Sequence, residues 1–158
     1  MIYLITGGIN TGKSTKMQEL FKKNPQGDGF VCPKVFDNSR FLRYDIRHLQ
    51  SGQTLPFAYP VNSVPENWDE QLRYGKYTFS AQAFSFADTI ADQSIRNHIS
   101  PLFLDEIGPL ELDLHEGFYS IFKKILSQDT DLYISIRKSR INNLANYLNM
   151  KKTHTIYL

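Results

Sequence analysis

Short apolar runs alternate along the chain with stretches of helical spacing. The runs over residues 2–5, 101–104 and 131–136 are typical of buried strands. Elsewhere apolar side chains recur every three or four positions, which predicts helices. These positions are Met17, Leu20 and Phe21; Phe84, Ala87, Ala91 and Ile95; Phe118, Ile121, Phe122 and Ile125; and Ile141, Leu144, Ala145 and Leu148. Strands that alternate with helices predict an α/β fold of three layers, with a mostly parallel sheet covered on both faces.

The middle of the chain follows a different pattern. Residues 29–36 are expected to form one strand, and strict alternation over 41–49 predicts a second strand with one solvated face, paired with the first. This hairpin makes the predicted sheet mixed. Residues 53–75 hold three prolines and the only tryptophan, and we expect a loop there with at most one short strand. No repeat or long linker interrupts residues 1–158, which predicts a single domain.

Composition narrows the class of protein. The chain has 158 residues, 41% apolar and 22% charged, which is typical of a globular domain. The net charge is only +2, and the Lys and Arg residues are scattered along the chain, so a nucleic-acid partner is not expected. No apolar run is long enough to span a membrane. The start of the chain lacks the features of a signal peptide. The single cysteine, Cys32, suits a reducing compartment, so we expect a cytoplasmic protein.

The stretch GGINTGKST follows the first predicted strand and precedes the first predicted helix. Its pattern, Gly7-x-x-x-x-Gly12-Lys13-Ser14, is that of a phosphate-binding loop, or Walker A motif. Glycines let successive backbone N–H groups converge on phosphate oxygens, and the positive end of the helix dipole points to the same place. Lys13 would contact the β- and γ-phosphates, and Ser14 would bind Mg²⁺. The predicted nucleotide-binding residues are Gly7, Gly8, Ile9, Asn10, Thr11, Gly12, Lys13, Ser14 and Thr15.

Two acids end another buried strand, in the sequence Leu102-Phe103-Leu104-Asp105-Glu106. This is the form of a Walker B segment. Ligands of a parallel sheet collect at the carboxyl ends of its strands, which is where these carboxylates are expected. Asp105 would hold Mg²⁺, directly or through a water, and Glu106 would orient and deprotonate the attacking water.

The run Asp105-Glu106-Ile107-Gly108-Pro109-Leu110-Glu111-Leu112 resembles the signature D-E-I-G-x-[ML]-E-L of a family of small P-loop nucleoside-triphosphatases. That family is known from thermophiles and, as a cancer-related nucleoside-triphosphatase, from human. Further stretches resemble the family in the same order: Gly29-Phe30-Val31, Arg43-Tyr44-Asp45-Ile46 with Ser51-Gly52, and Tyr74-Gly75-Lys76-Tyr77. The resemblance covers nearly the whole chain.

The resemblance implies a P-loop fold with a catalytic glutamate beside the Walker B aspartate. It also implies slow, Mg²⁺-dependent hydrolysis of ATP, GTP and other nucleoside triphosphates to the diphosphate and phosphate. Glu111 belongs to the signature, with a structural or a catalytic role. The chain departs from the family at residues 35–40, which lack the first arginine and the glycine of V-R-x-x-G-x-R, and at Leu158, where relatives continue with Asn-Arg.

Phosphoryl transfer needs a positive charge on the transition-state oxygens. Arg137 and Arg140 follow a predicted strand and could supply it, although solvated arginines at a helix start are an alternative. Ser135 could contact the γ-phosphate. Two other functions remain open: a small-molecule or nucleotide kinase built on the same loop, and a nucleotide-gated switch that hydrolyses slowly. A protein partner, if any, is not specified by the sequence.

Overall fold

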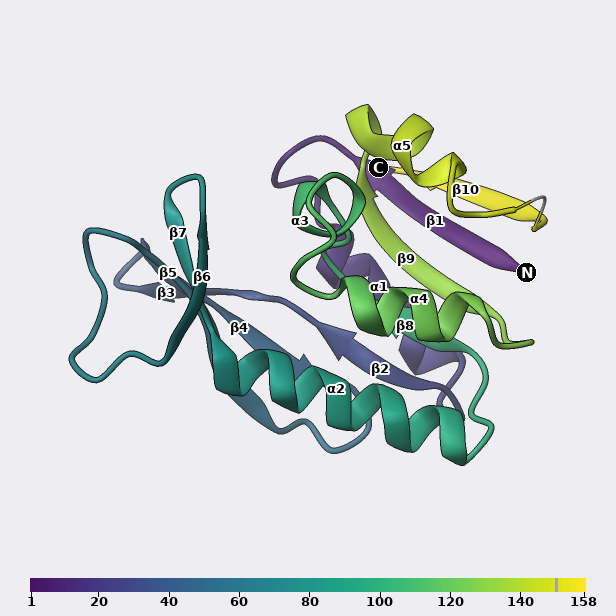
Figure 1. The fold of residues 1–158 in the computed structure, drawn as a ribbon, viewed down its shortest axis with the longest axis horizontal. Helices are drawn as coiled ribbons and strands as arrows, with labels where there is room; N and C mark the ends of the chain where they lie inside the picture. The colour runs from purple at the N-terminus through teal and green to yellow at the C-terminus, as the bar shows by residue number, and fades with distance from the viewer. Residues whose placement is uncertain (150) are drawn as a thin grey trace.

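The structure is a computed structural model that describes residues 1–149 and 151–158. In this part of the chain the strands form one ten-stranded mixed sheet (Figure 1). The strands are β1 (Ile2–Gly7), β2 (Asp28–Val31), β3 (Lys34–Asp37), β4 (Arg40–His48), β5 (Thr54–Pro60), β6 (Glu70–Tyr74), β7 (Tyr77–Ser80), β8 (Leu102–Leu104), β9 (Leu132–Arg137) and β10 (Thr153–Tyr157). The helices are α1 (Lys13–Lys23), α2 (Ala81–Arg96), α3 (Pro109–Leu112), α4 (Tyr119–Leu126), α5 (Ile141–Ala145) and the 3₁₀ turn η1 (Lys138–Arg140).

The strand order is β10-β1-β9-β8-β2-β4-β5-β7-β6, and β3 pairs with β4 alone. Strands β10, β1, β9, β8 and β2 are parallel to their neighbours in this series, whereas β4 and the strands beyond it are antiparallel. The predicted α/β fold with a mixed central sheet is therefore confirmed. Strand β9 lies between β1 and β8, so the carboxyl ends of these three strands meet at one edge of the sheet.

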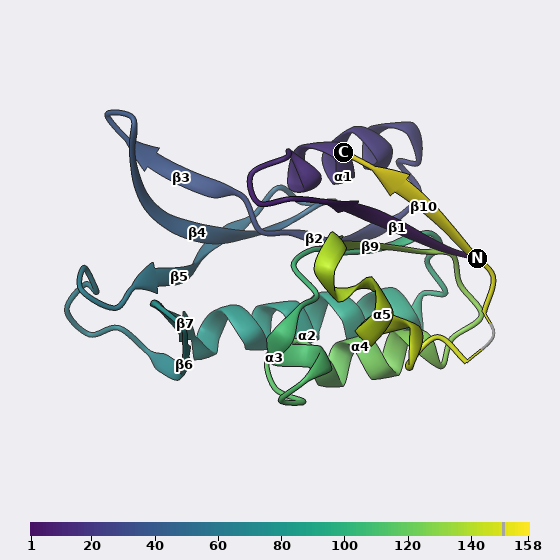
Figure 2. The same cartoon turned by 90° about the horizontal axis from the view of Figure 1, so that it is seen from above.

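Helices cover both faces of the parallel strands (Figure 2). On one face α1 buries Met17 against Ile5, Phe103 and Tyr133. On the other face α2, α4 and α5 pack over a larger core that includes Ile2 and Leu4. Alternate residues of β1 thus enter opposite cores, which is the period-two pattern of a strand buried on both sides. No helix in the described residues is long and apolar enough to cross a membrane.

The strand predicted over 29–36 is in fact two strands. The chain leaves the ladder at Cys32-Pro33, between β2 and β3, and both strands pair with β4. Proline has no N–H to donate, so a ladder is readily interrupted there. The interruption matters for function because it frees the N–H of Cys32 for a side chain described below.

The expectation of a loop over 53–75 is wrong, because β5 and β6 both form there. The prolines of β5 lie where a missing N–H costs little. Pro56 pairs next to an irregularity in the β4–β5 register, and Pro60 is the last residue of the strand. Together with β3, β4 and β7, these strands build an antiparallel extension that projects from the parallel sheet (Figures 1 and 2).

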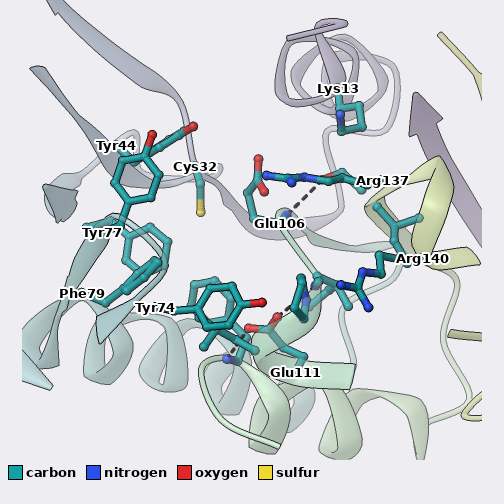
Figure 3. A pocket seen from close by; sticks show the side chains of 18 of the residues that line it. Lys13, Cys32, Tyr44, Tyr74, Tyr77, Phe79, Glu106, Glu111, Arg137 and Arg140 are labelled. Atoms are coloured by element: carbon teal, nitrogen blue, oxygen red, sulfur yellow. Dashed lines mark hydrogen bonds between the residues drawn. The ribbon is translucent and has the colours of Figure 1, made fainter. Parts of the chain in front are cut away.

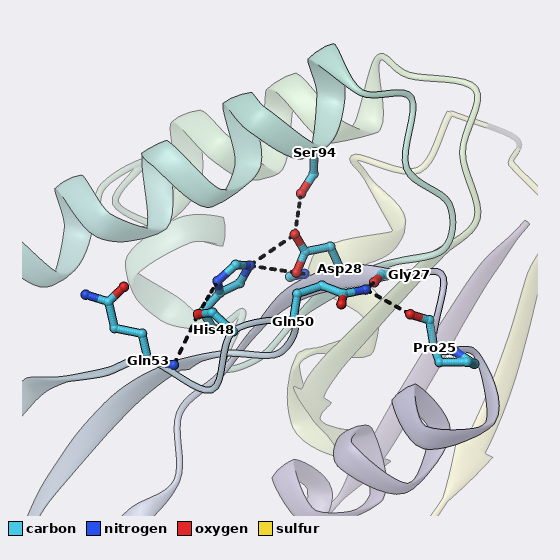
Figure 4. A network of polar contacts seen from close by, with 9 residues as sticks. Pro25, Gly27, Asp28, His48, Gln50, Gln53 and Ser94 are labelled. Atoms are coloured by element: carbon cyan, nitrogen blue, oxygen red, sulfur yellow. Dashed lines mark hydrogen bonds and ion pairs between the residues drawn. The ribbon is translucent and has the colours of Figure 1, made fainter.

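A polar network ties the base of this extension to α2 (Figure 4). It includes Asp28, the first residue of β2, and so lies at the amino ends of the parallel strands, whereas the Walker A sequence follows the carboxyl end of β1. Buried Asp28 accepts hydrogen bonds from the Ser94 hydroxyl at 3.2 Å and from the Gly29 N–H at 2.7 Å. The His48 ring lies 2.8 Å from the same carboxylate and 2.8 Å from the Ser51 hydroxyl. These contacts join β2, β4 and α2, and they stabilise the edge of the sheet away from the candidate site.

We predict that Gly29→Ala strongly destabilises the fold. Gly29 has a φ of 137°, and an added Cβ would lie 2.1 Å from the Phe103 carbonyl oxygen on the adjacent strand β8. Neither backbone can move without breaking the ladder, so we expect a loss of about 3 kcal/mol in the free energy of unfolding, measured in urea. Gly75→Ala is the matched control, since Gly75 also has a positive φ, of 57°, but open space around it. An equal loss in the two variants would contradict the prediction.

Candidate functional site

The Walker A stretch forms an exposed loop between β1 and α1, called the phosphate loop below (Gly7–Ser14). Its turn depends on two left-handed residues, Asn10 with a φ of 61° and Gly12 with a φ of 84°. The Thr11 hydroxyl donates to the Gly8 carbonyl at 3.2 Å, and the Lys13 ammonium folds back to the same carbonyl at 2.5 Å. The loop is therefore compact, and the Lys13 side chain lies across it, an arrangement that suits anion binding.

Helix α1 begins directly after Gly12, and no side chain or acidic residue caps its first turn. The first N–H groups of a helix have no partner within the helix, so those of α1 remain available to an anion. Ser14 is half-buried in this turn, whereas Thr15 and Ile9 are exposed. The loop and the helix start thus bring together most of the predicted nucleotide-binding residues.

Asp105 is fully buried at the end of β8 and accepts three hydrogen bonds. The Cys32 N–H reaches its Oδ2 at 2.8 Å, the Glu106 N–H reaches its Oδ1 at 3.1 Å, and the Ser135 hydroxyl also donates to Oδ1. The donors come from the break after β2, from the chain just beyond β8, and from β9. This carboxylate therefore joins three neighbouring strands at the edge where the phosphate loop emerges.

Glu106 has a φ of 63°, a left-handed conformation that is uncommon for glutamate. Its N–H lies within 3.1 Å of Asp105 Oδ1 and 3.0 Å of Ser135 Oγ, and these two contacts hold the turn. The side chain consequently projects into a cavity next to Lys13 (Figure 3). Burial among the cavity walls, followed by the charge of Asp105, raises the pKa of Glu106 to about 7, while Lys13, Arg137 and Lys34 act in the opposite direction.

Besides Lys13, three cationic side chains lie near Glu106 or its cavity, and they differ in their contacts. Arg137 ends β9 opposite Gly7, and its side chain extends toward Glu106 (Figure 3). Arg140 instead donates to Asp113 at 2.7 Å, so its charge is already paired. Lys34 is a third cation, which the sequence motifs do not single out. It bonds to the Asn10 side chain of the phosphate loop and lies 5.7 Å from the Phe41 ring centroid. The sequence does hold one indication of this role: Lys34 lies two positions before the place where the family has the first arginine of V-R-x-x-G-x-R.

The chemistry of the donor set fits Mg²⁺ in the way usual for triphosphate sites, where the ion keeps several waters and few protein ligands. An ionised carboxylate offers about four acceptor positions, and Asp105 uses three of them. One position remains, which suits a metal-bound water better than a direct bond from this buried group. Ser14 supplies a hydroxyl in the first turn of α1. Within residues 1–149 and 151–158 no group of three or more His, Cys, Asp or Glu side chains is placed to hold a metal ion.

A cavity of about 300 Å³ adjoins the phosphate loop at Lys13 and extends past Glu106 toward the antiparallel extension (Figure 3). The antiparallel extension lines it with aromatic rings, and the chain after β8 lines it from below. The end of β9 and the turn η1 close it with Ser135, Arg137 and Arg140. The wall on the side of the extension consists of Cys32, Tyr44, Phe57, Tyr74, Tyr77 and Phe79.

Comparison with known proteins agrees with this geometry. The model of a family described as NTPase matches residues 2–158. The chain belongs to the NTPase family. It is therefore an enzyme that hydrolyses nucleoside triphosphates, which are its substrates.

Two solved structures share the fold. THEP1 from the hyperthermophile Aquifex aeolicus has a TM-score of 0.75 at 18% identity, and the match covers 100% of this chain and 90% of THEP1. A human cancer-related nucleoside triphosphatase has a TM-score of 0.65 at 22% identity, covering 99% and 87% of the two chains. No curated protein sequence matches the chain. At these identities the two likenesses establish the NTPase fold, in agreement with the family match.

Glu111, the last acid of the NTPase signature, is engaged by the backbone. Its Oε2 accepts from the Gly108 N–H and its Oε1 from the Phe118 N–H, each at 2.9 Å. These bonds join the start of α3 to the start of α4 below the cavity. Burial nevertheless raises the pKa of Glu111 to about 7, because the loss of water outweighs the two amide donors, and the charge of Glu106 adds to the rise. The geometry favours the structural role.

This raised pKa predicts a pH-dependent stability. The folded protein binds a proton at Glu111 more tightly than the unfolded chain, whose glutamates titrate near the ordinary value of 4.5. The contribution of this proton is therefore complete below about pH 4.5 and is lost as the pH rises through about 7. Relative to Glu111→Gln, which cannot titrate, the free energy of unfolding of the wild type should fall by about 3 kcal/mol over that range.

Urea unfolding of both proteins at pH 4.5, 6 and 8 measures this difference. Glu116→Gln, which removes an exposed carboxylate nearby, controls for the loss of one charge. A gap between wild type and Glu111→Gln that stays constant with pH would contradict the role assigned to burial.

Proposed function

We propose that this NTPase hydrolyses ATP, GTP and related triphosphates to the diphosphate and phosphate in a Mg²⁺-dependent reaction, with Glu106 as the base that activates water. The observation that carries the proposal is that Glu106 and Lys13 line the same cavity. An acid held beside the lysine that would contact the terminal phosphate can both orient a water and accept its proton.

The roles of the other residues follow from their places. The N–H groups of the phosphate loop and Lys13 bind the phosphate oxygens. Ser14 and Asp105 would hold Mg²⁺. When bound, the ion neutralises charge on the β- and γ-phosphates. The hydrogen bonds of Asp105 and Ser135 fix the backbone of Glu106, which limits the positions its carboxylate can take.

Positive charge on the transferred group comes, in this proposal, from Arg137 and Lys34. Both lower the pKa of Glu106, and this closeness to the proposed base supports a place near the reacting phosphate. Lys34 is also tied to Asn10 of the phosphate loop. This contact supports a role for Lys34 in place of the arginine that residues 35–40 lack. Arg140, paired with Asp113, is a weaker source of charge. The lone, buried Cys32 suits a reducing compartment, so we propose a cytoplasmic enzyme.

Glu106→Gln should lower kcat for triphosphate hydrolysis by about 100-fold to 1,000-fold, because the amide cannot accept the proton of the attacking water. KM should change little, since the phosphate loop remains intact. The measurement is phosphate release from ATP, GTP, CTP and UTP with Mg²⁺ and with a chelator. Glu66→Gln, an exposed position on the antiparallel extension, is the matched control. An unchanged kcat in Glu106→Gln would remove this residue from the mechanism.

A further inference from the structure

The cavity beside Glu106 is much larger than hydrolysis requires. A water molecule occupies about 30 Å³ of liquid, and hydrolysis beside Lys13 needs space only for the terminal phosphoryl group and one attacking water. The cavity measures about 300 Å³, the lower end of the range found for small-molecule sites. Its walls come from several separate parts of the fold, including the antiparallel extension, Lys13 of the phosphate loop, the chain from Glu106 to Glu111, and the end of β9 with the turn η1.

The lining is chemically uneven. One side is aromatic: Tyr44 and Tyr77 pack edge to face with centroids 5.5 Å apart, and Phe57 and Phe79 do so at 5.2 Å. The other side is polar, with Lys13, Glu106, Arg137 and Ser139. Among the remaining charged groups, Glu111 is taken by two backbone N–H groups and Arg140 by Asp113. A ligand with a flat apolar body and a polar end directed at Glu106 fits this division.

The position of Glu106 defines which side of the phosphate the cavity serves. In phosphoryl transfer the attacking and leaving oxygens lie roughly in line on opposite sides of the transferred group. If Glu106 is the base, as the proposed function states, it lies on the attacking side. The aromatic wall of the cavity lies on the other side of Glu106 from Lys13, so the cavity extends to the attacking side, and an in-line leaving group would depart from the opposite side. An occupant of the cavity would therefore present the nucleophile.

We propose that this cavity is an acceptor site for a small aromatic or heteroaromatic alcohol, to which the enzyme transfers the γ-phosphoryl group in competition with water. The alcohol oxygen forms a bond to the γ-phosphorus while the bond from that phosphorus to the β,γ-bridging oxygen breaks. Glu106 accepts the hydroxyl proton, and the nucleoside diphosphate leaves with the bridging electron pair. The products are a phosphate monoester and the diphosphate. This inference rests on the proposed role of Glu106.

The test measures how each turnover divides between phosphate and phosphate ester. Enzyme, Mg²⁺ and ATP labelled in the γ-phosphate are mixed with benzyl alcohol or 3-pyridinemethanol as flat probes. Cyclohexylmethanol and ethanol serve as non-planar and small comparisons. We expect the ratio of ester to free phosphate, per mole of alcohol, to be at least ten-fold higher for a flat probe than for ethanol or cyclohexylmethanol. Glu106→Gln should lower ester and phosphate together.

Variants of the cavity wall separate its role from general effects on rate. Tyr77→Ala should lower the ester-to-phosphate ratio for the flat probes at least ten-fold. Tyr59→Ala is the matched control, because Tyr59 lies on the same extension but does not line the cavity. Leu110→Trp, which fills the cavity from α3, is a second variant in case Tyr77→Ala does not fold. The ratio is internal to each enzyme, so a change in overall turnover does not affect it.

The outcomes are distinct. Phosphate release with an ester ratio no higher for flat probes than for ethanol would overturn the acceptor site and leave the proposed hydrolysis intact. Flat probes that compete with ATP and form no ester would overturn it in favour of a cavity that binds the nucleoside base. Phosphate release that survives Glu106→Gln unchanged would instead refute the proposed function on which the inference rests.

Discussion

The buried carboxylate of Asp105 is the contact on which the rest of the site depends. It lies at the end of a three-residue strand and accepts hydrogen bonds from β9, from the break after β2 and from its own successor in the chain. A fully buried charge is tolerated only when it is well hydrogen-bonded, and three donors meet that condition. Removal of any donor would leave part of this charge uncompensated, so the three strand ends are held in one arrangement.

Two functional features follow from this arrangement. Glu106 is held in a left-handed conformation, which costs an L-residue about 1–2 kcal/mol. Because of this conformation, its carboxylate lies in the cavity beside Lys13. The contact to the Cys32 N–H also fixes the point at which the sheet changes from parallel to antiparallel. The antiparallel extension can then close over Glu106 and build a cavity of about 300 Å³. Strain at one residue and excess volume next to it are features of a site shaped for a reaction.

The sequence was sufficient where local chemistry determines structure. The glycines and lysine of residues 7–15 have few uses other than an anion-binding loop, and the acids after a buried strand had to lie at its carboxyl end. The sequence was insufficient where a contact with a residue far away in the chain determines the structure. Pro56 and Pro60 argue against strands until the irregular register with β4 is known. From the sequence alone Lys34 cannot be told from an ordinary surface lysine, because its contact with Asn10 exists only in the fold. In the same way Arg140 cannot be told from Arg137, because the ion pair of Arg140 with Asp113 is a long-range contact.

The central claim is that the Asp105 network forces Glu106 into a strained backbone conformation beside the phosphate loop. The free energies of unfolding of Glu106→Gly and Glu106→Ala test it most directly, since both variants lack the carboxylate and differ only in backbone freedom. At an ordinary position alanine is the more stable residue. Because Glu106 has a φ of 63°, we expect the glycine variant to be more stable than the alanine variant by about 1 kcal/mol. An alanine variant as stable as the glycine variant, or more so, would contradict the account.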